Sequence, residues 1–166
     1  MRDCAGTRMM RRILFPFFVA FSVVVLDQLT KAWILYDLMN PPRVIEILPF
    51  IDIVLVWNKG IGFGLLQAGS PWGMISLIVL ALGICFALGG WIWKTTDKFL
   101  VVCLSMIIGG AIGNVIDRLR FGAVVDFIYV HVYILGYRFP AFNVADSAIT
   151  IGVCLLLIES YVRKKQ

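Results

Sequence analysis

Four long apolar segments constrain this chain more than any other feature of its sequence. They cover residues 13–35, 72–93, 99–116 and 144–162. A helix needs about 20 apolar residues to cross the hydrocarbon core of a bilayer, which is about 30 Å thick. The composition agrees, because 61% of the 166 residues are hydrophobic and only 15% are charged, whereas average globular chains are about a quarter charged. The sequence therefore predicts an integral membrane protein with four spanning helices.

We expect one domain over residues 1–166, because no internal repeat or low-complexity linker separates the four segments. The first segment follows two arginines, as the apolar part of a signal peptide does. Its apolar run continues past Asp27, however, and no small-residue cleavage site follows it cleanly. We therefore expect a retained helix. Residues 1–12 before it form a leader, unstructured ahead of Met9.

Basic residues orient the four segments. They are dense at three short stretches, which lie before the first segment, between the second and third, and after the fourth. Short flanks rich in lysine and arginine stay in the cytoplasm, so we place these stretches and both termini there. The long loops over residues 36–71 and 117–143 then face outward. The net charge of +5 is accordingly a signal of membrane topology, and we expect no nucleic-acid partner.

The two outward loops contain predicted strands. Residues 44–57 and 124–134 are rich in β-branched and aromatic side chains, which favour strands. A hairpin turn is expected at Leu135 and Gly136. The predicted fold is therefore a membrane all-α four-helix bundle with a small outward-facing β-sheet on the membrane surface.

Polar residues collect at one level of this predicted bundle. The outward ends of the first, third and fourth segments carry Asp27, Gln28, Lys31, Asn114, Asp117, Arg118, Asn143 and Asp146. The outward loops add Asn58 and Asp126. A charged group at membrane depth costs several kcal/mol unless it is paired or hydrated, so such residues mark a candidate site.

Several of these residues also have a structural explanation. Asp27 and Lys31 are four residues apart on one helix face, which suits either an ion pair or a pair that positions a substrate. Arg118 with its neighbour Asp117 is either an ion pair or a positioning element. Asn143 is suited to cap the fourth helix, because its side-chain oxygen can accept an N–H from the first turn.

Asn58 lies in a glycine-rich turn, WNKGIGFG, where it either shapes the loop or takes part in a site.

For Asp126 and Asp146, a structural and a catalytic explanation are equally open. Two neighbouring carboxylates can share one proton. One then acts as general base on a water while the other donates to the carbonyl under attack, which hydrolyses an amide without metal or cofactor. Serine and zinc alternatives lack support, since the chain has no GxSxG and only one histidine.

Four blocks of the sequence resemble, in order and spacing, the motifs of the bacterial lipoprotein signal peptidase, signal peptidase II. They are LDQLTK (26–31), WNKGIGFGLL (57–66), GGAIGNVIDRLRFGAVVDFI (109–128) and FNVADSAITIG (142–152). One mild departure is Gly62, where the family usually carries a residue such as alanine or serine.

The resemblance implies an aspartic endopeptidase of the bacterial inner membrane that removes signal peptides from prolipoproteins with a diacylglyceryl-modified cysteine. The implied catalytic residues are Asp126 and Asp146, near the periplasmic face. The implied supporting residues are Asp27, Lys31, Asn58, Gly60, Asn114, Arg118 and Asn143. The strands are expected to cradle the substrate on the membrane surface. Since Asp146 begins a helix, whose dipole favours a charged carboxylate, we assign the shared proton to Asp126.

A small ion-coupled membrane transporter is the alternative function. Transporters place their binding groups near the bilayer midplane, often at broken helices. Here the carboxylates lie at helix ends on one side, and the segments do not pair as repeats. A non-catalytic assembly subunit explains the glycines of residues 107–113 as a packing face, but not the converging carboxylates.

Overall fold

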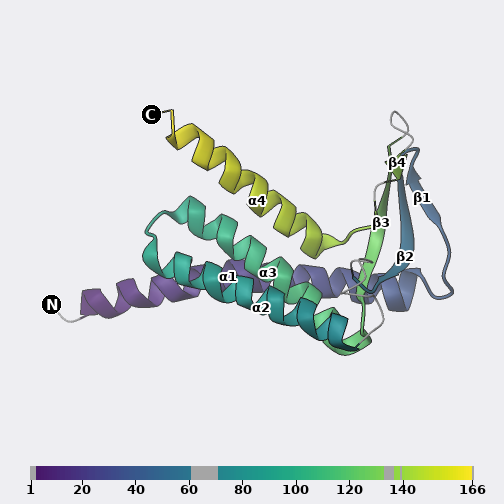
Figure 1. Ribbon diagram of the computed structural model, residues 1–166, viewed down its shortest axis with the longest axis horizontal. Helices are drawn as coiled ribbons and strands as arrows, with labels where there is room; N and C mark the ends of the chain where they lie inside the picture. Colours follow the sequence, from purple (N-terminus) through teal and green to yellow (C-terminus); the bar gives the residue numbers. More distant parts are fainter. Residues whose placement is uncertain (1–2, 61–70, 133–136, 139, 166) are drawn as a thin grey trace.

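The computed structural model describes residues 3–60, 71–132, 137–138 and 140–165. Four helices, α1 (Asp3–Trp33), α2 (Pro71–Lys94), α3 (Lys98–Phe121) and α4 (Val144–Arg163), extend from a small sheet that stands at one end (Figure 1). Both chain termini lie at the other end. All four helices are long and apolar enough to cross a membrane, α1 together with the π-helix η1 (Ile34–Leu38) that continues it. The predicted fold of four membrane helices with a small sheet is confirmed.

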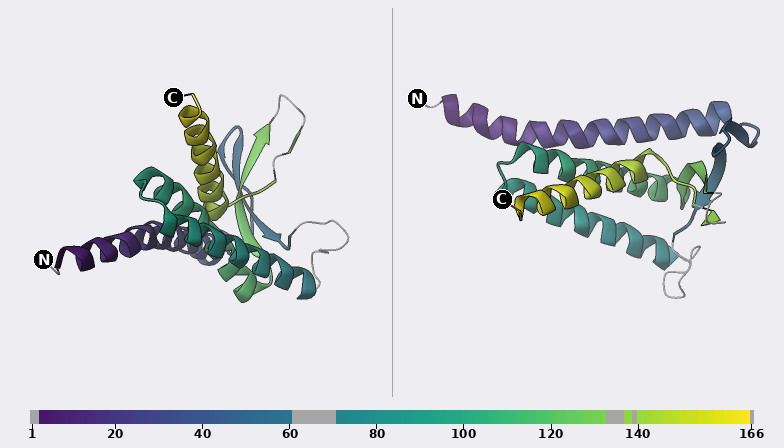
Figure 2. Two further views of the ribbon diagram at one scale, coloured as in Figure 1. Left: turned by 60° about the vertical axis from the view of Figure 1, so that its left-hand side comes forward. Right: turned by 90° about the horizontal axis from the view of Figure 1, so that it is seen from above.

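Two helix boundaries differ from the prediction. Helix α1 begins at Asp3, so the leader predicted to be unstructured ahead of Met9 is helical over its described part. Together with η1, α1 runs the length of the molecule to the sheet (Figure 2). Helix α3 continues past the predicted end at residue 116 because polar residues remain helical beyond the apolar run. It ends where Gly122 adopts the left-handed conformation and its N–H donates to the Arg118 carbonyl (3.0 Å).

Glycines allow α3 to pack closely between α1 and α4. A Cβ on Gly109 would lie 2.6 Å from the Ala20 carbonyl oxygen in α1, and one on Gly110 would lie 2.4 Å from the Ala145 carbonyl oxygen in α4. Real Cβ atoms do not approach so closely. Small residues in membrane helices bring backbones together in this way. The glycines of α3 therefore set the spacing of the three helices that carry the predicted site.

The sheet is antiparallel in the order β1 (Ile45–Leu48), β2 (Ile51–Asn58), β3 (Val124–Val132), β4 (Tyr137–Arg138). The strand predicted over residues 44–57 is therefore two strands. The break falls at Pro49 and Phe50, because proline has no N–H to donate to a ladder. The strand predicted over residues 124–134 is confirmed as β3, and the turn expected at Leu135 and Gly136 lies outside the described residues.

The sheet is anchored to the end of the bundle by an apolar core. Ile34, Met39 and Phe127 are buried together, and side chains from the first three strands and the start of α4 pack around them. In addition, Phe142 and Ile128 exchange two backbone hydrogen bonds, of 3.0 and 2.8 Å. These contacts hold the chain that leads into α4 against the middle of β3, beside Asp126.

Candidate active site

Asp126 and Asp146 come from two elements that this anchoring brings together. Asp126 lies on β3, opposite Val56 of β2, and its side chain is 1% exposed. Asp146 lies in the first turn of α4. The pKa of the Asp126 carboxyl is raised from 3.8 to about 6. Burial is the main cause and the nearby Asp146 carboxylate adds to it, while hydrogen bonds from Asn58 and Asn143 and the charge of Lys31 act in the opposite direction. Asp126 is thus suited to hold a proton at mildly acidic pH, up to about 6.

Three asparagine side chains orient the two aspartates. Each donates one hydrogen bond to a different carboxylate oxygen of Asp126 or Asp146. The amide of Asn143 donates to Asp126 Oδ1 (2.7 Å), and that of Asn58 donates to Asp126 Oδ2 (2.9 Å). The amide of Asn114 donates to Asp146 Oδ1 (2.8 Å). All three were predicted as supporting residues, and the structure brings them together around Asp126 and Asp146.

Asn143 also caps α4, as its position in the sequence predicted. Its side-chain oxygen accepts the Asp146 N–H (2.9 Å), and Asp146 Oδ2 in return accepts the Asn143 N–H (3.3 Å), which completes a capping box. Asp146 therefore belongs to the cap as well, and its carboxylate is oriented at both oxygens. Asp146 is therefore both a member of the capping box and a candidate catalytic group.

Asn58 has two roles that the sequence presented as alternatives. Its oxygen accepts the Gly60 N–H (2.9 Å) and so shapes the turn after β2, while its nitrogen holds Asp126. Gly60 has a φ of +108°, a conformation that residues with a side chain rarely adopt. Gly62 lies outside the described residues.

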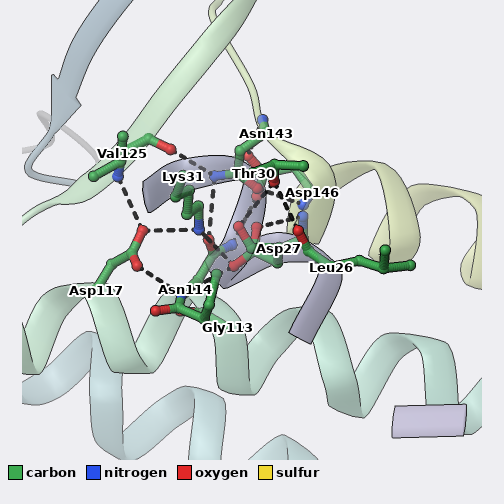
Figure 3. Close-up of polar contacts among 12 residues, drawn as sticks. Leu26, Asp27, Thr30, Lys31, Gly113, Asn114, Asp117, Val125, Asn143 and Asp146 are labelled. Atoms are coloured by element: carbon green, nitrogen blue, oxygen red, sulfur yellow. Dashed lines mark hydrogen bonds and ion pairs between the residues drawn. The ribbon is translucent and has the colours of Figure 1, made fainter. Parts of the chain in front are cut away.

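A buried ion cluster lies beside the two aspartates. Figure 3 shows it next to Asp146. The Lys31 ammonium contacts Asp27 Oδ2 and Asp117 Oδ2, both at 2.8 Å, and also donates to Asn114 Oδ1 (3.2 Å). Lys31, Asp27 and Asp117 are each at most 2% exposed. The expected pair of Asp27 and Lys31 is present. Asp117, however, pairs with Lys31 from another helix instead of with its neighbour Arg118.

Arg118 is half-buried at the end of α3, where its guanidinium donates to the Asn114 carbonyl (3.3 Å). Its positive charge also interacts with the carboxylates of Asp126 and Asp146. Arg118 is therefore placed to influence the charge of the pair, and its supporting role stays a prediction.

Gln28 and Asp117 belong to the cluster but were absent from the predicted supporting set. The Gln28 amide donates to Asp117 Oδ1 (2.9 Å) and to Asp27 Oδ2 (3.2 Å). Their polarity at the ends of apolar segments could have placed them at the level of the site. It does not show which residues they contact. The contacts of Asp117 with Gln28 and Lys31 join two helices, which spacing along one helix does not reveal.

Comparison with known proteins identifies the family. A family model described as "Signal peptidase (SPase) II" matches residues 19–162. The chain belongs to the signal peptidase II family. It is 44% identical over 142 residues to a lipoprotein signal peptidase of Rhodopseudomonas palustris (strain ATCC BAA-98 / CGA009), with 84% of this chain and 87% of the relative covered.

A second relative of this chain is a lipoprotein signal peptidase of Acinetobacter baumannii (strain SDF). It is 42% identical over 145 residues, with 86% of this chain and 81% of the relative covered. A solved structure described as a bacterial membrane enzyme superposes with a TM-score of 0.77 at 35% identity, covering 92% of this chain and 90% of the other. Membership in this family supports a multi-pass membrane peptidase and not the transporter alternative.

Proposed function

We propose that this chain is an aspartic endopeptidase that removes the signal peptide from prolipoproteins whose cysteine carries diacylglycerol. The observation that carries the proposal is the pair of Asp126 and Asp146. Their carboxylates interact electrostatically at the sheet end of the membrane helices, and each is oriented by asparagine side chains. Family membership supports the substrate class, because the relatives are named lipoprotein signal peptidases.

Asp126 and Asp146 share one proton in the resting enzyme, with the proton on Asp126 in the dominant arrangement. Asp146 takes a proton from a water held between the two carboxylates, and the hydroxide attacks the carbonyl that precedes the modified cysteine. Asp126 donates its proton toward the carbonyl oxygen. When the tetrahedral intermediate collapses, the proton on Asp146 passes to the leaving amide nitrogen, the C–N bond breaks, and a hydroxyl of the intermediate returns a proton to Asp126.

The asparagines and Arg118 keep this pair aligned. Asn114 and Asn143 orient the carboxylates through the hydrogen bonds described above. Arg118 supplies a positive charge beside a site that carries net negative charge, and it orients the substrate backbone. The substrate enters laterally between the helices, with the sheet as its cradle on the membrane surface.

The site faces the periplasm in this proposal, and both termini are cytoplasmic. The support is the distribution of basic residues, which are dense at the chain ends and in the loop between α2 and α3. Both termini lie at the end of the bundle opposite the sheet (Figure 1). The protein is accordingly placed in the bacterial inner membrane.

A gel-shift assay tests this function. Purified protein is mixed with a diacylglyceryl-modified prolipoprotein, with and without a metal chelator, and release of the signal peptide is followed. We expect chelator-resistant cleavage by the wild type, none by Asp126→Asn or Asp146→Asn, and normal cleavage by Asp37→Asn, which changes an exposed carboxylate in η1. Near-normal cleavage by either of the first two variants contradicts the assignment, and complete loss with chelator indicates a metalloenzyme.

A further inference from the structure

Two backbone N–H groups connect the buried ion cluster to the proposed catalytic pair. Asp117 Oδ2 accepts the N–H of Val125 (3.1 Å), the residue immediately before Asp126. Asp27 Oδ1 accepts the N–H of Ala145 (2.9 Å), the residue immediately before Asp146. Each buried carboxylate of the cluster therefore holds the backbone next to one catalytic aspartate.

Lys31 joins these two attachments. Its ammonium lies 2.8 Å from the Asp27 carboxylate and 2.8 Å from the Asp117 carboxylate (Figure 3). We propose that Lys31, Asp27 and Asp117, the Lys31 network, are positioning residues that fix the separation of Asp126 from Asp146. The proposal rests on the proposed function, since it assigns a task to groups that do not touch the substrate.

The energetics of burial favour a positioning role over a purely stabilising one. Removing three ions from water costs several kcal/mol each, and buried ion pairs are often no more stabilising than apolar residues of the same volume. What apolar residues cannot do is accept a backbone hydrogen bond. The N–H of Ala145 belongs to the first turn of α4, where the helix itself supplies no acceptor. Asp27 supplies that acceptor from α1.

A third connection reaches Asp146 directly. Lys31 donates to the oxygen of the Asn114 side chain (3.2 Å), which leaves the nitrogen of that amide to donate to Asp146 Oδ1 (2.8 Å). Lys31 thus also determines which way the Asn114 amide faces, together with the Asn143 amide, which donates to the same oxygen (3.2 Å). An amide with its oxygen toward Asp146 would repel the carboxylate.

The surroundings hold the network in place. The Gln28 amide donates to Asp117 Oδ1 and to Asp27 Oδ2, so the two carboxylates share a second donor besides Lys31. A Cβ on Gly113 would lie 2.6 Å from Asp27 Oδ2, so α3 admits the carboxylate only because a glycine stands there.

A double variant with unchanged net charge distinguishes two roles of Lys31, which are to position Asp126 and Asp146 and to neutralise the buried carboxylates. Lys31→Met leaves Asp27 and Asp117 as two buried negative charges, whereas Lys31→Met with Asp117→Leu leaves one, which equals the net charge of the intact network, and removes the acceptor of the Val125 N–H. We expect the double variant to regain thermal stability relative to Lys31→Met. We expect kcat to stay about 100-fold low in both, the loss typical of a misplaced catalytic group, with little change in KM.

Controls make each outcome decisive. Lys98→Met is the same substitution at an exposed lysine at the far end of the bundle, and it should keep wild-type kcat and stability. Asp117→Leu alone is similar in size but cannot accept the Val125 N–H, and its kcat should fall with KM unchanged even if the lysine variants do not fold. Recovery of kcat along with stability in the double variant, or a wild-type kcat in Asp117→Leu, overturns the proposal.

Failure of the proposed function is distinguishable in the same set of proteins. If the wild type does not cleave prolipoprotein, the proposed function fails. Amide hydrogen exchange then still tests the network, because Val125 and Ala145 should exchange faster in the charge-balanced double variant and unchanged rates contradict it. If the wild type cleaves and the variants retain kcat, only the positioning role fails.

Discussion

The stability of this protein should depend on pH through Asp126, and Asp126→Asn should remove that dependence. The pKa of the folded carboxyl is raised from 3.8 to about 6, mainly by burial. As pH rises from about 4 to about 6, the unfolded chain releases this proton while the folded chain retains it. Stability falls wherever the folded state binds more protons than the unfolded state.

The size of the effect follows from the pKa. One pKa unit is worth about 1.4 kcal/mol, so a rise from 3.8 to about 6 lowers the free energy of unfolding by about 3 kcal/mol once pH exceeds the folded value. This contribution is absent below pH 4, where both states are protonated. Asparagine does not titrate, so Asp126→Asn should gain about 3 kcal/mol over the wild type between pH 4 and pH 7.

Equilibrium unfolding in detergent micelles at pH 4, 5, 6, 7 and 8 measures this difference. Val56→Ala is a matched control, because Val56 lies opposite Asp126 in the sheet and carries no titrating group. Its stability difference from the wild type should be the same at every pH. A difference between Asp126→Asn and the wild type that does not grow with pH refutes the reasoning. In Asn58→Ala, which lacks a hydrogen bond that favours the charged form, the transition should move to higher pH.

Three further substitutions test how the fold holds the site. Gly110→Ala should lower stability by about 1–3 kcal/mol in thermal unfolding, because its Cβ would lie 2.4 Å from the Ala145 carbonyl oxygen. The control Gly83→Ala should leave stability unchanged, because nothing lies within 4 Å of its Cβ. Gly60→Ala should cost about 1–2 kcal/mol, since φ is +108° there, and should reduce cleavage in the gel-shift assay. Asn143→Ala should lose about 0.5–2 kcal/mol from the cap alone, plus nearly all cleavage, and normal cleavage would contradict its role at Asp126.

Sequence alone determined the membrane class, the number of spanning helices and the level at which polar residues gather. A bilayer admits few spanning structures, and length and hydropathy identify them directly. The cap at Asn143 and the pairing of Asp27 with Lys31 were also predictable, because both act within one helix turn. Side chains three or four residues apart on a helix meet whatever the rest of the chain does.

Only the tertiary structure decided which distant groups meet. Asp117 could not be matched with Lys31 from spacing, since they lie on α3 and α1 and come together where glycines let those helices approach. The split of the predicted strand at Pro49 likewise became clear only from the pairing of β1 with β2. The raised pKa of Asp126 depends on burial and on Asp146 beside it, which are properties of the folded chain. Local spacing specifies neighbours within an element, whereas a carboxylate's proton affinity depends on every element packed around it.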